Sequence, residues 1–127
     1  MTSHILDASA LLALINKEPG ADKVSACLPG VFMSAVNYAE VATVLKDIGM
    51  PDHEVETLLS TLVEHVVSFD QNQAMGSASL RPLTKDKGLS LGDRACLALA
   101  KEKNLPAVTA DRAWGALDHG IQVILIR

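Results

Sequence analysis

Four carboxylates in this chain occupy positions where an ionised side chain needs a partner. Asp7 and Asp111 each follow a short apolar stretch, HIL and PAVTA, that predicts a β-strand. Glu40 and Asp93 lie within the first two turns of two predicted helices. Sites in parallel α/β sheets form beyond the carboxyl ends of the strands. The four acids are therefore expected to converge at one edge of a sheet.

Glu40 and Asp93 have no basic residue on their own helical face. The residues three and four positions away are Val36, Asn37, Thr43 and Val44 for Glu40, and Leu89, Ser90, Cys96 and Leu97 for Asp93. Ser90 is predicted to cap its helix, which places Asp93 in the first turn. A buried carboxylate without a cation is costly, so we expect both acids to be buried for a chemical reason.

Carboxylates brought together repel one another unless they are protonated or bridged by a cation. Their convergence predicts a hard divalent metal with oxygen ligands, Mg²⁺ or Mn²⁺. Zinc is disfavoured, because the four histidines are scattered without the spacing of zinc ligands. The sequence also contains no Gly-rich phosphate loop, nucleophile elbow or Cys–His pair.

Asp7 and Asp111 also have structural explanations. Asp7 precedes a predicted helix and can cap it, and Asp111 can stabilise a turn. Ser9 and Thr109 each lie two residues from one of these acids. Their hydroxyls can hydrogen-bond a metal ligand or a water, or they can cap the local backbone.

The elements that must position these acids alternate along the chain. Strands are predicted at 4–6, 31–33, 65–69, 106–109 and 123–126, and helices at 9–16, 21–28, 35–48, 51–61, 70–80 and 91–103. Residues 81–88 are predicted to form a proline-containing basic loop. The alternation predicts one α/β domain over residues 1–127, with a mainly parallel sheet covered by helices on both faces.

Composition restricts the partners. The net charge of −4 comes from 15 acidic and 11 basic residues and argues weakly against nucleic acid. If four acids bind metal, the other 11 balance the 11 bases and phosphate can approach the site. Aromatic residues make up only 3% of the chain, which gives little support to a base-stacking platform. The hydrophobic fraction of 49% predicts an apolar interface with another chain.

The two cysteines and the amino terminus predict the compartment. Cys27 and Cys96 are far apart and form no CxxC pair, so we expect reduced core residues. No apolar run approaches the roughly 18 residues of a membrane span, and MTSHILDASALLALI has no basic leader or cleavage site. We therefore expect a soluble cytoplasmic protein.

The four acids lie in runs that resemble a known family. Asp7, Glu40, Asp93 and Asp111 are carried by HILDASALLALI, SAVNYAEV, LSLGDRACLALA and VTADRAW, respectively. The order and spacing of these runs resemble the four acidic motifs of PIN-domain ribonucleases, specifically the VapC-type toxins of bacterial toxin–antitoxin pairs. The resemblance covers essentially the whole chain and departs from the pattern at no acidic position. It implies a three-layer α/β/α PIN-like fold.

The resemblance also implies Mg²⁺-dependent endonucleolytic cleavage of RNA, with the four acids as metal ligands and catalytic residues. Asp7, Glu40 and Asp93 are expected to hold one or two Mg²⁺, with Asp111 binding directly or through water. In-line attack by an activated water would leave 5′-phosphate and 3′-hydroxyl ends.

Further residues are expected to serve this site, and the resemblance also implies partners. Arg94 and Arg112 are the leading candidates to contact the RNA backbone, ahead of the bases in residues 81–88. Trp114 is expected to pack beneath the site. A homodimer is implied, together with a small antitoxin whose helix lies in an apolar groove. The RNA sequence that is cut leaves no readable side-chain code.

Two other functions remain open at this point. A signalling receiver domain is also an α/β domain with acids at strand ends and a bound magnesium. It resembles this chain less, because Leu6–Asp7–Ala8 lacks a second acid and no lysine ends the late strands. A PIN scaffold that binds a partner without catalysis would show no metal-dependent cleavage.

Overall fold

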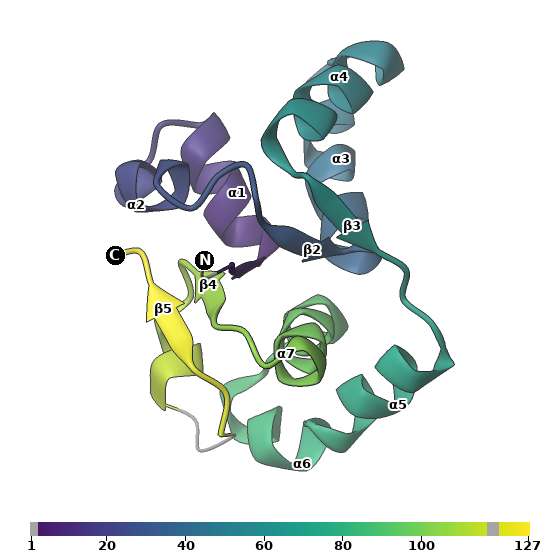
Figure 1. Ribbon diagram of the computed structural model, residues 1–127, viewed down its shortest axis with the longest axis vertical. Helices are drawn as coiled ribbons and strands as arrows, with labels where there is room; N and C mark the ends of the chain where they lie inside the picture. The colour runs from purple at the N-terminus through teal and green to yellow at the C-terminus, as the bar shows by residue number, and fades with distance from the viewer. Residues whose placement is uncertain (1–2, 117–119) are drawn as a thin grey trace.

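The computed structural model describes residues 3–116 and 120–127 (Figure 1). Short strands alternate with helices along the chain, as the sequence predicts. The elements are β1 (Ile5–Leu6), α1 (Ala8–Ile15), α2 (Ala21–Ser25), β2 (Phe32–Ser34), α3 (Ala35–Asp47), α4 (Asp52–Leu62), β3 (His65–Val67), α5 (Gln71–Ser79), α6 (Arg81–Thr84), α7 (Leu91–Lys103), β4 (Ala107–Thr109) and β5 (Val123–Leu125), with 3₁₀ helices η1 (Lys85–Lys87) and η2 (Arg112–Ala116).

The strands form one sheet in the order β3-β2-β1-β4-β5, and all the pairs run parallel. The central strand β1 is hydrogen-bonded to β2 and β4. Leu6 of β1 is paired with Val108 of β4, so the next residues, Asp7 and Thr109, emerge side by side. They emerge at the carboxyl edge of the sheet, where parallel α/β folds form their sites.

Helices cover both faces of the sheet, with α1 to α4 on one side and α5 to α7 on the other (Figure 1). Leu6 belongs to a buried cluster with Leu11 and Leu59. Its neighbour Ile5 belongs to a second cluster with Leu97. Successive side chains of a strand point to opposite faces, so β1 contributes to both cores. The three-layer α/β/α architecture predicted from the sequence is confirmed.

Residues 81–88 differ from the prediction, because they form α6 and η1 rather than a loop. Pro82 lies in the first turn of α6, where a missing N–H costs no helical hydrogen bond. Thr84 is fully buried and its hydroxyl donates to Leu80 O, which anchors the segment. Gly88 ends it with a positive φ of 67°. The loop prediction was wrong because proline breaks a helix only beyond its first turn.

Smaller differences concern the ends of two elements. Helix α2 ends at Ser25 and β3 ends at Val67, both earlier than predicted.

Cys27 and Cys96 are free thiols, and Cys96 is fully buried. In residues 3–116 and 120–127, no helix has the length and apolar character needed to cross a membrane.

Candidate metal centre

Asp7 is the buried centre of the site. It follows β1 directly, and its side chain is only 3% exposed. The Ser9 hydroxyl donates to Asp7 Oδ2 at 2.6 Å and the Thr109 hydroxyl donates to the same oxygen at 2.9 Å. The carboxylate makes no capping hydrogen bond to α1. The capping explanation for Asp7 therefore does not account for its position.

The two hydroxyls connect the ends of β1 and β4. Ser9 Oγ accepts from the Ala110 N–H at 3.0 Å, and Thr109 Oγ1 accepts from the Asp111 N–H at 3.0 Å. The hydroxyl oxygens themselves lie 3.2 Å apart. Each hydroxyl thus binds a backbone N–H and donates to Asp7, so the carboxylate and the chain leading to Asp111 are held together.

Burial raises the pKa of Asp7 from 3.8 to about 6. The hydrogen bonds from Ser9 and Thr109 oppose this increase, and the negative charges of Asp93 and Glu40 add to it. Burial also raises the pKa of the Cys96 thiol, and the charges of Asp7, Asp93 and Glu40 raise it further. Asp7, Glu40 and Asp93 are therefore close enough to interact electrostatically, as their predicted convergence requires.

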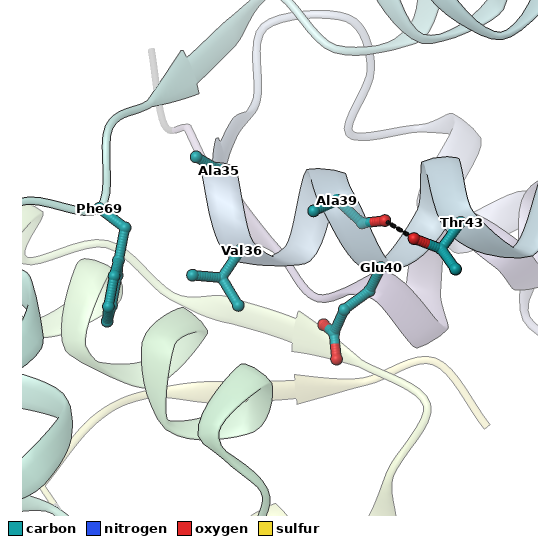
Figure 2. A pocket seen from close by; sticks show the side chains of 6 residues that line it. All are labelled: Ala35, Val36, Ala39, Glu40, Thr43 and Phe69. Carbon is teal, nitrogen blue, oxygen red and sulfur yellow. Dashed lines mark hydrogen bonds between the residues drawn. The ribbon is translucent and has the colours of Figure 1, made fainter. Parts of the chain in front are cut away.

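Glu40 reaches the site from α3, and it is exposed rather than buried. The sequence predicted burial because its helical face carries no cation, but that face borders an open groove. Figure 2 shows Glu40 and Val36 extending from the same side of α3, with Phe69 across the groove. The amide Nδ2 of Asn37 donates to Glu40 Oε1 at 2.9 Å. A neutral donor, not a cation, orients this carboxylate.

Asp93 and Asp111 are half-buried and each makes a local hydrogen bond. Asp93 Oδ2 accepts from the Ser90 N–H at 2.9 Å, which completes the predicted capping box of α7. Asp111 Oδ1 accepts from the Ala113 N–H at 2.9 Å. The turn explanation for Asp111 is therefore correct, although it uses only one carboxylate oxygen.

The four carboxylates share one pattern within the described residues: one oxygen is hydrogen-bonded and the other is not. The bonded atoms are Asp7 Oδ2, Glu40 Oε1, Asp93 Oδ2 and Asp111 Oδ1. Among residues 3–116 and 120–127, none of the four forms an ion pair. Each carboxylate is thus oriented through one oxygen and retains a second that can bind a hard cation.

The side chains do not by themselves form a closed coordination shell. In the described part of the chain, no three Asp, Glu, His or Cys side chains are grouped closely enough to hold a metal ion. Like charges drive carboxylates apart, and a divalent cation reverses that force. The donor set fits Mg²⁺ or Mn²⁺ in its chemistry, with oxygen ligands that pair with no base among the residues that the structure describes.

The two arginine candidates hydrogen-bond to backbone carbonyls, and the aromatic candidate lies in the core. Arg94 Nη1 donates to Ser77 O at 3.1 Å, against α5, and Arg112 Nε donates to Arg127 O at 3.2 Å. Within the described ranges, neither guanidinium is hydrogen-bonded to any of the four carboxylates. Trp114 is 0% exposed and packs in the core, as predicted.

Sequence reasoning missed Asn37 and Gly92. Asn37 is 0% exposed, and its Nδ2 also donates to Gly92 O at 2.9 Å. The spacing of three residues between Asn37 and Glu40 was visible in the sequence and is typical of a side-chain pair on one helical face. The contact with Gly92 joins residues far apart in the chain and had no local signal.

The raised pKa of Asp7 predicts how stability depends on pH in metal-free buffer. The folded chain holds this proton more tightly than the unfolded chain, so the stability that it contributes is complete below pH 3.8 and is lost as pH rises through about 6. Asp7→Asn removes the titration. We expect the variant to gain up to about 3 kcal/mol over the parent protein between pH 4 and 7.

Denaturant unfolding at several pH values measures this difference. Asp86→Asn, at an exposed position, is the matched control and should show a nearly constant difference. An Asp7→Asn curve parallel to that of the parent protein would show that Asp7 is ionised without cost.

Comparisons with known proteins place this geometry in a family. A family model described as PIN domain matches residues 4–120. A toxin–antitoxin complex from Klebsiella pneumoniae contains a similar chain, with a TM-score of 0.77, 23% identity and 98% of each chain covered. The DNA-bound VapBC of Salmonella typhimurium also contains a similar chain, with a TM-score of 0.75, 19% identity and 100% of each chain covered. No curated protein matches the sequence.

A third similar structure is VapC20 of Mycobacterium tuberculosis, described as a sarcin–ricin loop cleaving toxin. Its TM-score is 0.73 at 21% identity, with 90% of this chain and 94% of that chain covered. At these identities the likeness establishes the common fold.

Proposed function

Since this chain belongs to the PIN domain family, we propose that it is a Mg²⁺-dependent endoribonuclease and acts in the cytoplasm as the toxin of a toxin–antitoxin pair. The single observation that supports this most is the shared pattern of the carboxylates. Asp7, Glu40, Asp93 and Asp111 each keep one oxygen free of protein hydrogen bonds in the described residues. Because the chain belongs to the PIN domain family, it is not a receiver domain.

The protein's own residues position and orient the ligands. Asp7, Glu40 and Asp93 would hold the metal, and Asp111 would bind it directly or through water. Ser9 and Thr109 hold Asp7 Oδ2, so Oδ1 would be the oxygen available to the ion. When bound, Mg²⁺ supplies the Lewis acidity that activates a water for in-line attack on the phosphodiester and neutralises the developing charge.

Similar structures support the choice of RNA and of the toxin role. VapC20 is described as cleaving the sarcin–ricin loop, and several similar chains come from VapBC or other toxin–antitoxin complexes. We assign RNA cleavage to this chain because its acids follow β1 and β4 and lie in the second turn of α3 and the first turn of α7. Single-stranded or loop RNA is the expected substrate class.

Sequencing of 5′-phosphate RNA ends tests the proposal and identifies the substrate. Cells expressing the protein should accumulate new ends at a small set of sites, and cells expressing Asp93→Asn should not. Identical end profiles in the two cultures would reject the nuclease assignment.

A PIN module without catalysis is the second candidate. It is favoured by one observation, that no three candidate ligands are grouped closely within residues 3–116 and 120–127. The two candidates differ in a single result, because only the nuclease cuts RNA when Mg²⁺ is added.

Exposed apolar surface indicates that this chain binds protein partners. The groove between α1, α2 and α4 is lined mainly by aliphatic side chains: Leu14, Ile15, Leu28, Leu58 and Leu62. Ile48, at the end of α3, is 71% exposed. Such surfaces favour a covering chain. We expect a homodimer by light scattering and loss of nuclease activity when the product of the neighbouring gene is added.

The concentration of the protein matters in this measurement. A strict monomer at about 100 μM, far above a micromolar dissociation constant, would contradict the dimer. Undiminished cleavage with excess neighbouring-gene product would contradict the antitoxin role.

A further inference from the structure

Asn37 connects two helices that carry candidate metal ligands. It lies in the first turn of α3 and is 0% exposed. Its amide nitrogen donates to Glu40 Oε1 and to Gly92 O, both at 2.9 Å. Both neighbours are acceptors, so the nitrogen must face them and both of its hydrogens are used. Glu40 and the first turn of α7 are thereby held by one side chain.

This arrangement has a cost that packing alone does not explain. The remaining atom of the amide, Asn37 Oδ1, is buried and has no hydrogen-bond partner among the described residues. A buried polar atom without a partner destabilises the fold. Asn37 therefore serves its two acceptors at the expense of stability, which is typical of a site and not of a core.

Gly92 provides the space into which Glu40 fits. A Cβ at this position would lie 2.6 Å from Glu40 Oε1 and still closer to Oε2. The Glu40 carboxylate thus rests directly on the backbone of Gly92, the residue that precedes Asp93. Gly92 has an ordinary helical backbone, so glycine is needed here for space and not for conformation.

Glu40 needs such support because its side chain is long and exposed. Its charge interacts with that of Asp7, and the repulsion favours rotation into solvent. A lysine or arginine would hold the carboxylate but would also neutralise it and compete with a cation. An amide donor and a missing side chain hold it without adding charge.

We propose that Asn37 and Gly92 are positioning residues that seat the Glu40 carboxylate against the first turn of α7, beside Asp93. They prearrange two carboxylates from different helices for one divalent cation. The inference rests on the proposed function only for the identity of that cation, since the seat itself is a property of the fold.

Gly92→Ala is the sharpest test, because it displaces the flexible end of Glu40 and not the backbone. Alanine also has the higher helix propensity, so the fold should persist. We expect Mn²⁺ affinity, measured by electron paramagnetic resonance, to fall about 10- to 100-fold. The thermal midpoint should stay equal or rise.

The chain offers a matched control, Gly76→Ala in α5. A Cβ there would lie 3.5 Å from Ala98 Cβ, an ordinary contact. This variant makes the same change in a helix without touching Glu40, and its Mn²⁺ affinity should equal that of the parent protein.

Asn37→Leu tests the other positioning residue. It keeps the buried volume but removes both donors, and its Mn²⁺ affinity should fall as in Gly92→Ala.

A second readout needs no metal. The side-chain NH₂ protons of Asn37 should exchange slowly with solvent in the parent protein and in Gly76→Ala, and faster in Gly92→Ala.

A double variant tests whether the effect passes through Glu40. In a Glu40→Gln background, Gly92→Ala should cause no further loss of Mn²⁺ affinity, because it acts through Glu40.

The outcomes separate the two proposals. Unchanged amide exchange in Gly92→Ala, or an equal loss of affinity with and without Glu40, would overturn the positioning role. If the parent protein binds no Mn²⁺ but exchange still rises only in Gly92→Ala, the seat is supported and the metal-dependent function is refuted.

Discussion

Purified Asp7→Asn protein should cut RNA on the order of 10³-fold more slowly than the parent protein at saturating Mg²⁺. Asp7 is the only one of the four acids that is almost fully buried, and both hydroxyls at the strand ends converge on it. Asparagine keeps its shape and can still accept from Ser9 and Thr109. It removes the negative charge that attracts the cation.

Folding must be separated from catalysis in this experiment. The same substitution should raise stability near neutral pH, so a lost activity cannot be attributed to unfolding. Asp86→Asn, which removes an exposed carboxylate in η1, should cut at the parent rate. Cleavage by Asp7→Asn at the rate of the parent protein would show that Asp7 is not a required metal ligand.

Removal of divalent metal should be the other large effect. With EDTA in excess, cleavage should fall to background, and Mg²⁺ or Mn²⁺ should restore it. Ca²⁺ should restore it poorly, because its larger and looser coordination misplaces the attacking water. The free oxygens of the four carboxylates, with no nearby lysine or arginine paired to them in the described residues, leave this chemistry to the ion.

A titration of EDTA-treated protein with each metal provides the measurement. The parent protein and Glu40→Gln should differ in the Mg²⁺ concentration needed for half-maximal rate. Full activity in EDTA would refute the metal mechanism.

Local patterns made much of the fold predictable. Apolar runs followed by an acid placed β1 and β4, and Ser90 with Asp93 predicted the capping box that the structure contains. These signals lie within a few residues of one another and depend on hydrogen bonds of the same turn. Parallel pairing then brings Asp7 and Thr109 together, because β1 and β4 are neighbours.

The remainder depends on contacts between distant parts of the chain. The exposure of Glu40 is decided by what covers its face of α3, which its helical neighbours do not reveal. The direction of Arg94 is set by a carbonyl of α5. Asn37 and Gly92 meet only because α3 and α7 pack together. No periodicity in the sequence reports such a contact.

The chemistry of the RNA ends left by purified protein tests the four-carboxylate metal centre most directly. We expect 5′-phosphate and 3′-hydroxyl ends, formed with Mg²⁺ and absent with EDTA or with Asp7→Asn. Ligation of an adaptor to the 3′ ends, with and without phosphatase treatment, distinguishes the products. Ends carrying a 2′,3′-cyclic phosphate, or cleavage that persists in EDTA, would contradict hydrolysis at a metal centre formed by Asp7, Glu40, Asp93 and Asp111.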